Sequence, residues 1–519
     1  VAVGVWAVAL LPFAAAAAES AREPLTWQQM SDSQLASPSV LAHVWWPPSA
    51  PVNLDQLNSL SFVGVLTAVA AIVGCLTRRP GAALGRWLAL GSAAAMLPGP
   101  GSWLIYRVVP LMDVFRPYGR LAMYLSFGLV LLGGIGIDAT GDRMAARLRA
   151  GRGWMPQVRR RWYTHAAVLI ALNSVHLAWF GMANNPDLAP RSSASVLPDT
   201  EFVVALRNEA TGVEGAWPGR AVAVSATELP GGPPTAPILW AAHGAWVGVE
   251  VSSGYNTTLP ARSQRLLRVL AGEPVESVLA GDSSSAFVPV MHWGIVRTDL
   301  FATLGYDLVV TPPSLNSTSQ WAAQHVASGD LVVLFENAEG TIYRVVGATA
   351  GARPAERVEV VADERAALER LAAGATIDGT VLLAADDLTR LGLGLDDGDT
   401  VASAEVGDVS RGPNGYRFTV QADAPTLVVV PVNWSDGWEA TADGRSLPLV
   451  RGNYQQMVVA VPEGVTEVSL QYTSPGFEAG LWVSGLTVLL LVGVPAARWV
   501  RRRQLAALDQ SGENTETPA

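Results

Sequence analysis

The stretch AGLWVSGLTVLLLVGVPAARWVRRR, residues 479–503, carries no charge before Arg498 and the triplet Arg501–Arg503. An α-helix needs roughly 20 apolar residues to cross ~30 Å of hydrocarbon. Because an arginine costs about 3 kcal/mol at the centre of such a helix, arginines mark its ends. We therefore predict a membrane-spanning helix over residues 479–497 and a cytoplasmic tail over residues 498–519.

Similar apolar runs fill the first part of the chain, and we predict an α-helical transmembrane bundle of about six spans, mainly within residues 1–183. The span that begins at residue 84 is short and ends at Pro98-Gly99-Pro100-Gly101. Proline and glycine interrupt helical hydrogen bonding, so we expect a broken helix continued by an interfacial segment, Trp103–Met112. The five predicted spans before the last are residues 1–18, 59–76, 84–100, 119–138 and 164–183.

The distribution of arginine predicts the orientation of these spans. One set of flanks holds 14 arginines (Arg78, Arg79 and Arg86, seven from Arg143 to Arg161, and four after residue 497), whereas the alternate short loops hold four. Cytoplasmic loops of membrane proteins carry the excess of arginine and lysine. We therefore expect a multi-pass protein of the bacterial cytoplasmic membrane, with membrane lipids as partners. Residues 19–58, 101–118 and 184–478 are predicted to be extracytoplasmic.

Residues 184–478 have the composition of a soluble domain, with 35 Asp and Glu against 17 Arg, a net charge of −18. This charge excludes nucleic acid as a partner, because it repels anionic polymers. The alternative interpretation is that this charge simply keeps a large domain soluble. We expect an extracytoplasmic α/β region over residues 184–350 and an extracytoplasmic β-sandwich over residues 351–478.

The α/β region mixes helix and strand patterns. Phe202–Arg207 and Ala221–Ser225 have the pattern of strands, and Arg262–Leu270 has helical spacing. In the sandwich region one helix is predicted over Asp363–Ala373, and Asp443-Gly444 is typical of a type I′ hairpin turn. Six strands are predicted over residues 400–409, 415–421, 425–431, 437–442, 455–461 and 465–473.

The composition points to a bacterial source, because all 35 basic residues are arginine, which is typical of a GC-rich genome. Cys75 is the only cysteine, so no disulfide can form within the chain. The chain begins with Val1 inside an apolar run, and we expect it to be part of a longer protein. A signal peptide over residues 1–18 is the alternative interpretation, although a basic region is missing before it.

Several motifs resemble the bacterial membrane protein YfhO family. Phe115-Arg116-Pro117-Tyr118-Gly119-Arg120 followed by Gly133–Asp138 is similar to the family's FR-x-P-x-R … AG-x-G-x-D stretch. Gly437-Trp438, Asp443-Gly444, Val461-Pro462-Glu463-Gly464 and Tyr472–Gly480 follow in the order of its C-terminal ending. The resemblance is to the C-terminal half of the family.

This resemblance implies a relative of the GT-C glycosyltransferases. Such enzymes take a sugar from a polyprenyl-phosphate carrier and add it to an envelope polysaccharide or teichoic-acid-like acceptor outside the membrane. The chain would then be the C-terminal part of such an enzyme, with the catalytic acid upstream. The alternative is a non-catalytic membrane scaffold or transport accessory whose outer domain binds envelope polymer.

Three groups of residues are candidates for the site. Arg116 and Arg120 would contact the lipid-linked phosphate, or else anchor a helix end to headgroups or pair with Asp113. Asn173 and His176 share a face inside a predicted span, where interhelical hydrogen bonding is the alternative to a substrate or proton role. The third group, Trp434, Asp436 and Trp438, could form a glycan platform or pack in a turn.

Strong catalytic motifs are missing from the sequence. The six histidines are scattered without metal-ligand spacing, so no metal site and no cofactor is predicted, and no motif supports a divalent metal. Glu19, Glu23 and Asp32 could supply acids from the first loop, but their spacing does not distinguish them from solvated residues. The sequence therefore leaves the catalytic residues unknown.

Overall fold

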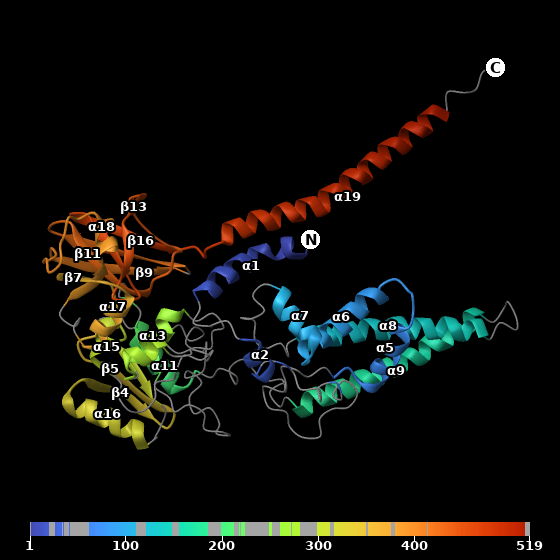
Figure 1. Cartoon of the computed structure of the whole chain (residues 1–519), viewed down its shortest axis with the longest axis horizontal. Helices are drawn as coiled ribbons and strands as arrows, with labels where there is room; N and C mark the ends of the chain where they lie inside the picture. The colour runs from blue at the N-terminus through green and yellow to red at the C-terminus, as the bar shows by residue number, and fades with distance from the viewer. Residues whose placement is uncertain are drawn as a thin grey trace. The chain divides into compact units, whose positions relative to one another are not determined.

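The structure is a computed structural model of the whole chain (Figure 1). It contains two compact units: residues 1–23 with 198–519, called here the sandwich unit, and residues 24–197, called the helical unit. The described residues are 2–19, 26–33, 35, 41, 62–109, 121–147, 155–184, 199–211, 217, 219–223, 249–251, 260–270, 272–280, 298–311, 316–348, 351–374, 379–412 and 414–513.

The helical unit is arranged around one long helix, α8 (Ala122–Arg147), which packs against both α5 (Val65–Cys75) and α6 (Ala82–Met96). Its core is built largely from small side chains such as Ala68, Ala71 and Ala89. Small residues let helix backbones approach closely in a membrane, where hydrophobic exclusion from water supplies no driving force between helices. The other helices of this unit are α2 (Trp27–Ser33), α7 (Pro100–Val108) and α9 (Met155–Asn184).

Two glycines set the distance between α5 and α8. A Cβ added at Gly74 would overlap the carbonyl oxygen of Leu132, and one added at Gly136 would overlap the carbonyl oxygen of Ala70. The two helices therefore touch backbone to backbone from both sides. Gly133–Asp138, one of the motifs in the sequence, supplies this contact rather than a ligand loop.

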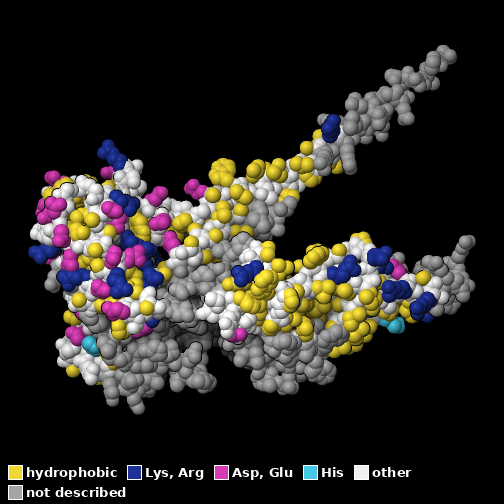
Figure 2. All heavy atoms as spheres, in the orientation of Figure 1, with side chains coloured by type: hydrophobic (Ala, Val, Ile, Leu, Met, Phe, Trp, Pro, Cys, Tyr) yellow, Lys and Arg dark blue, Asp and Glu magenta, His cyan; other side chains and the backbone are white. Residues whose placement is uncertain are grey.

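Helices lie over all six predicted spans, but only some of them are long and apolar enough to cross a membrane alone. In the described part of the chain two meet this test, Ala122–Arg147 and Phe477–Arg501, and a bent pair would make three. Shorter apolar helices cover Ala7–Ala18 and Val65–Cys75. In Figure 2 apolar side chains cover much of the visible surface of these helices, whereas charged side chains gather on the sandwich unit. The full count of about six crossings stays a prediction.

The predicted break after residue 96 is confirmed. α6 and α7 meet at an angle of 91°, as in a broken span or a re-entrant loop. Leu97 is extended, Gly99 has a φ of 157°, and Pro100 begins α7 at a position where its missing N–H costs no hydrogen bond. The Pro-Gly-Pro-Gly sequence thus turns the chain sharply at one end of α6.

The sandwich unit contains the first and last helices of the chain. α1 (Ala2–Ala18) packs along the first part of α19 (Phe477–Glu513). The contact is close, because a Cβ at Gly480 would lie 2.5 Å from the carbonyl oxygen of Ala7. The backbone N–H of Val8 also donates to Ser484 Oγ at 2.9 Å.

A mixed five-stranded sheet in the order β2-β1-β3-β5-β4 forms the α/β part of this unit. Its strands β1 and β2 run parallel to β3, whereas β3, β5 and β4 are antiparallel neighbours. The strands are β1 (Arg220–Ala223), β2 (Glu250–Val251), β3 (Leu308–Thr311), β4 (Leu331–Asn337) and β5 (Gly340–Val345). The helices are α11 (Glu201–Thr211), α13 (Ala261–Leu270), α14 (Val275–Ala280), α15 (Thr298–Leu304) and α16 (Asn316–Ser328).

The strand predicted over Phe202–Arg207 is wrong, because this segment belongs to α11. Thr200 begins the helix, and its hydroxyl accepts a hydrogen bond from Val203 N at 3.2 Å, the role of an N-cap. Phe202, Leu206 and Ala210 then lie buried on one helical face. The adjacent Val203 and Val204 favour a strand in the sequence. The N-cap and the four-residue spacing of the buried side chains are instead typical of a helix.

The predicted β-rich ending forms two facing sheets, in the orders β13-β12-β16-β10-β9 and β14-β15-β11-β6. All six predicted strands coincide with observed ones. Between the sheets lie buried apolar side chains such as Phe418, Val430 and Leu470. The strands are β6 (Arg353–Pro354), β9 (Ala404–Gly412), β10 (Gly415–Ala422), β11 (Thr426–Asn433), β12 (Trp438–Ala442), β13 (Arg445–Leu447), β14 (Leu449–Gly452), β15 (Gln456–Val461) and β16 (Gly464–Tyr472).

A further layer covers the outer face of the four-stranded sheet. It consists of the parallel pair β7 (Arg357–Val361) and β8 (Thr380–Ala384) with α18 (Ala385–Leu391), joined through α17 (Glu364–Ala372). β11 is therefore buried on both faces, which explains its continuous apolar sequence. The helix predicted over Asp363–Ala373 is confirmed, with Asp363 as its N-cap.

The glycine contact between α5 and α8 gives a testable prediction. Gly136→Ala should lower the free energy of unfolding by about 1–3 kcal/mol, the usual cost of overpacking. Gly134→Ala, two residues away on the same helix, is the matched control, because a Cβ there meets nothing within 4 Å. Thermal unfolding in detergent measures both. Equal stability of the two variants would contradict the close packing.

Candidate functional site

The two arginines predicted to contact phosphate, Arg116 and Arg120, lie outside the described residues. The described segments on either side of them belong to one apolar cluster. Met30 of α2 is fully buried there, against Ile105 and Tyr106 of α7 and against Leu121, which precedes α8. The described residues before and after Arg116 and Arg120 in the sequence therefore lie in the same cluster.

The surface of this cluster is aromatic and basic. The rings of Trp27 and Tyr106 lie 5.6 Å apart, and the guanidinium carbon of Arg107 lies 5.8 Å from the ring centroid of Trp103. A cation over a tryptophan ring at this distance is a favourable arrangement, and such rings are enriched at membrane–water boundaries. The bent α6–α7 pair thus presents an arginine and aromatic rings together, groups that can contact a phosphate and a sugar.

Asn173 makes interhelical hydrogen bonds. Its side-chain amide donates to Val63 O at 3.2 Å and to Thr67 Oγ1 at 3.1 Å, which ties α9 to the start of α5. Gly64 lets the two approach, because a Cβ at this position would overlap the Asn173 side chain. The side chain of His176 lies outside the described residues. The bonds of Asn173 are those of a structural residue, and a substrate role for the pair stays untested.

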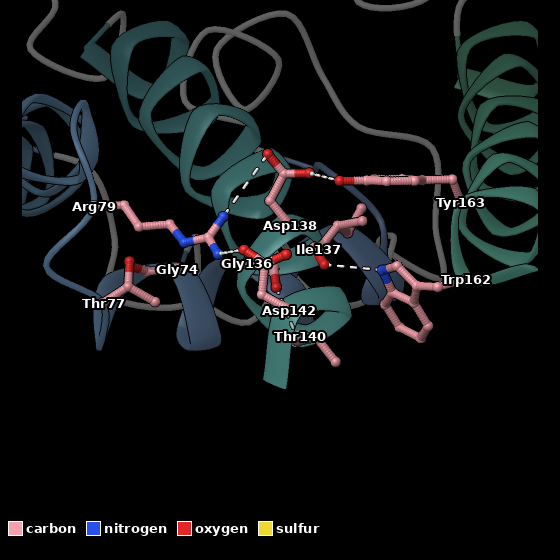
Figure 3. Close-up of polar contacts among 10 residues, drawn as sticks. All are labelled: Gly74, Thr77, Arg79, Gly136, Ile137, Asp138, Thr140, Asp142, Trp162 and Tyr163. Carbon is pink, nitrogen blue, oxygen red and sulfur yellow. Dashed lines mark hydrogen bonds and ion pairs between the residues drawn. The ribbon is translucent and has the colours of Figure 1, made fainter. Parts of the chain in front are cut away.

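A second polar cluster, shown in Figure 3, lies at the opposite end of α8 from Ala122. Arg79, between α5 and α6, forms ion pairs with Asp138, at 4.0 Å, and with Asp142. Tyr163 of α9 donates to Asp138 Oδ1 at 3.1 Å, and Trp162 Nε1 donates to Ile137 O at 3.0 Å. This cluster connects α8 to α9 and to the turn between α5 and α6.

The polar contacts of this cluster have a structural role, because they hold neighbouring helices together. The Asp138 and Asp142 side chains are 54% and 48% exposed, so each pair contributes at most about 1 kcal/mol. Arg86 adds a helix cap by donating to Cys75 O at 2.9 Å and Thr77 O at 3.0 Å. In the described part of the chain, no group of three or more His, Cys, Asp or Glu side chains could hold a metal ion.

The residues proposed as a glycan platform form a turn at one edge of the sandwich. Trp434 N donates to Gln455 O at 2.6 Å, and Trp438 N donates to Ser435 O at 3.1 Å. Both tryptophans are half-buried against the sandwich core, whereas Asp436 is exposed. Trp438 stacks on Tyr416 and packs against Tyr472, with ring centroids at 6.2 and 5.3 Å. These contacts are those of a turn packed on the core, and they leave part of each ring accessible.

Sequence reasoning missed a partly buried charged network that joins the α/β sheet to the sandwich. Arg220 Nε lies 3.3 Å from Glu250, and its Nη1 donates to Leu304 O at 3.0 Å. Glu250 also accepts from the Tyr416 hydroxyl at 2.8 Å and pairs with Arg411 at 3.1 Å. Burial, together with the nearby Glu250 charge, raises the pKa of Tyr416. Tyr416 and Glu250 are 166 residues apart, so no local pattern could have indicated the pair.

The C-terminal motifs now have a defined structural setting in the sandwich and the start of α19. Residues 400–484 match the family "Bacterial membrane protein YfhO". The YfhO resemblance of the sequence is therefore confirmed over this segment, which runs from the residues before β9 to Ser484 of α19. The motifs before residue 400 lie outside the YfhO match.

Comparisons over the full length are distant. The chain has a TM-score of 0.31 and 15% identity to a structure titled "Single-Particle Cryo-EM Structure of Arabinofuranosyltransferase AftD from Mycobacteria". The alignment covers 91% of this chain and 41% of that one, so this chain spans less than half the length of the protein it matches. No curated protein matches the chain.

The hydrogen bonds of Asn173 give a prediction that tests the structural role of this residue. Asn173→Leu and Thr67→Val should each destabilise the protein, and the double variant should lose less than their sum. Hydrogen bonds between membrane helices couple by about 0.6 kcal/mol on average, up to roughly 1.7. A double-mutant cycle of thermal unfolding measures the coupling. Strict additivity would show that the bond is not formed.

Proposed function

We propose that this chain is the C-terminal part of a membrane glycosyltransferase that uses a polyprenyl-phosphate-linked sugar to modify cell-envelope glycans. The observation that carries the proposal is the YfhO match over residues 400–484. This segment holds the ordered motifs from Gly437-Trp438 to Gly480 and runs from the sandwich into the last membrane helix. The resemblance of those motifs supplies the reaction class.

The reaction sets clear requirements. A carboxylate must take the proton of the acceptor hydroxyl, and cations must stabilise the departing phosphate. We assign the second role to Arg116 and Arg120, which follow α7 in sequence. Arg107 and Trp103 of α7 support this assignment, because they place an arginine and an aromatic ring shortly before Arg116 and Arg120 in the sequence. The carboxylate is assigned to the part of the enzyme that precedes this chain.

The proposal includes a location. The protein lies in the bacterial cytoplasmic membrane with residues 184–478 on the extracytoplasmic side, where an envelope acceptor would reach it. Support comes from the arginine distribution and from the two to three helices that could span a membrane.

A protease experiment tests this location. Protease added to intact spheroplasts should cleave within residues 184–478 and leave the C-terminal tail uncut. Protection of this domain until the cells are lysed would contradict the orientation. A cytoplasmic marker protein reports on lysis.

The phosphate role of the two arginines is tested by binding. The full chain, reconstituted in vesicles, should bind a polyprenyl-phosphate sugar, and Arg116→Ala/Arg120→Ala should weaken binding at least about tenfold, since two charge-assisted hydrogen bonds are lost. Arg143→Ala/Arg147→Ala is the control, because these arginines flank the predicted cytoplasmic side. Unchanged binding would remove Arg116 and Arg120 from the site.

The second candidate is a membrane scaffold or transport accessory whose outer domain binds envelope polymer. The half-exposed Trp434 and Trp438 beside Asp436 favour it, because partly accessible rings can stack on sugars. The two functions differ in what Trp438→Ala does to binding. In a scaffold, Trp438→Ala would abolish binding of the envelope polymer. In the transferase, the variant would still bind the lipid-linked sugar donor.

A further inference from the structure

Ion pairs in the sandwich unit mostly join one arginine to one carboxylate, as in the pairs of Arg268 with Glu273 and Arg370 with Glu359. Glu364, at the start of α17, pairs with two arginines, as Glu250 does with Arg220 and Arg411. Arg262 Nε donates to Glu364 Oε1 at 3.0 Å, and Arg451 Nη1 lies 3.0 Å from the same oxygen. Two arginines from α13 and β14 therefore converge on one carboxylate oxygen.

A third arginine adds to the excess of positive charge. Arg265 follows Arg262 by three residues on α13, which places both on the same helical face. Burial alone would raise the pKa of Glu364, but the hydrogen bond and charge of Arg262 outweigh it. The charges of Arg451 and Arg265 act in the same direction, and the pKa lies below its usual value. Three arginines and one glutamate leave a net charge of +2 within a region whose net charge is −18.

A buried polar side chain, Tyr454, lies beside this cluster. Tyr454 is only 3% exposed, and Arg265 interacts with its hydroxyl. Burial raises the pKa of Tyr454, whereas a hydrogen bond with Arg265 and the charges of Arg265 and Arg262 lower it, so the hydroxyl faces the cluster.

The backbone that carries Tyr454 is held in an unusual conformation. Asn453 and Tyr454 have φ values of 45° and 71°, in the left-handed region that residues other than glycine rarely adopt. Asn453 is fully buried and fixes this turn, since its Oδ1 accepts from Leu382 N at 2.9 Å and its Nδ2 donates to Gln456 at 2.8 Å. Strain of this kind concentrates at binding sites, where it orients a side chain.

The cluster begins close to the end of the apolar helix α1. Ala261 N, at the start of α13, donates to the carbonyl oxygen of Glu19, just after α1. Arg262 is the next residue, so its Cα lies about 3.8 Å from that of Ala261. α1 packs along α19, which is long and apolar enough to span a membrane. A phosphate at the membrane surface would therefore be near this cluster.

We propose that Arg262, Arg265 and Arg451 form a binding site for a phosphate group, with Glu364 as the internal counter-ion of the ligand-free protein. A phosphate monoester carries about −1.5 to −2 at pH 7 and matches the net charge of the cluster better than a single carboxylate does. Arginine forks bind phosphate oxygens in pairs. The phosphate belongs either to a lipid headgroup or to a soluble group, and the site does not require the chain to transfer sugar.

The test uses inorganic pyrophosphate as the probe, titrated calorimetrically into the full chain in phosphatidylcholine nanodiscs. Arg265→Gln should weaken binding about tenfold, the loss of one charge-assisted hydrogen bond. Glu364→Gln should tighten binding, because it removes the competing carboxylate. A purely structural ion-pair cluster would not give these opposite signs. Arg370→Gln and Glu359→Gln, which disrupt a one-to-one pair nearby, are the matched controls and should bind like the wild type.

Nanodiscs that also contain phosphatidic acid identify the source of the phosphate. Weaker pyrophosphate binding in those discs would show that a lipid headgroup occupies the site, whereas equal binding would indicate a soluble phosphate. The proposal is overturned if the wild type does not bind pyrophosphate in phosphatidylcholine discs. It is also overturned if Arg265→Gln and Glu364→Gln both bind like the wild type while circular dichroism shows them folded.

Discussion

The contact between α1 and α19 is the constraint on which the sandwich unit depends, because it joins the first helix of the unit to the start of its last helix, 476 residues further along the chain. It exists because Gly480 has no side chain where the backbone of α1 passes at Ala7. Beyond this contact, the carbonyl of Glu19 accepts from Ala261 at the start of α13. α1 is therefore attached to α19 by this contact and to the start of α13 by the hydrogen bond of Glu19. A larger residue at position 480 would separate the helices and disturb this arrangement.

The same physical device recurs in the helical unit, where Gly74 and Gly136 bring α5 and α8 into backbone contact. Inside a membrane, helices gain nothing from leaving water, so packing and a few hydrogen bonds decide their association. The amide of Asn173 and the ion pairs of Arg79 add such bonds at two places along α8 and its neighbours. The polar residues of this unit thus serve mostly to position helices.

The sequence predicted what local patterns determine. The strands from residue 400 to 472 and the helix over 364–372 follow from alternation, capping and turn residues, and the break after Met96 follows from Pro-Gly-Pro-Gly. Phe202–Arg207 was misjudged because two valines outweighed the capping hydroxyl of Thr200. The convergence of Arg262 and Arg451 on Glu364, like the pairing of Tyr416 with Glu250, joins residues far apart in the chain. Nothing in the spacing of single residues reports such long-range contacts, and the candidate site therefore emerged mainly from the structure.

Cysteine cross-linking tests the α1–α19 contact most directly, since Cys75 is the only cysteine and can be replaced by alanine. Val8 N lies 2.9 Å from Ser484 Oγ, so cysteines at positions 8 and 484 should fall within the separation of about 4.4–6.8 Å between Cα atoms that a disulfide requires. Oxidation of Val8→Cys/Ser484→Cys in membranes should keep the N- and C-terminal fragments linked after protease cleavage between them. The pair Val8→Cys/Val492→Cys should not cross-link. Separate fragments from the first pair, with both cysteines still reactive, would contradict the account.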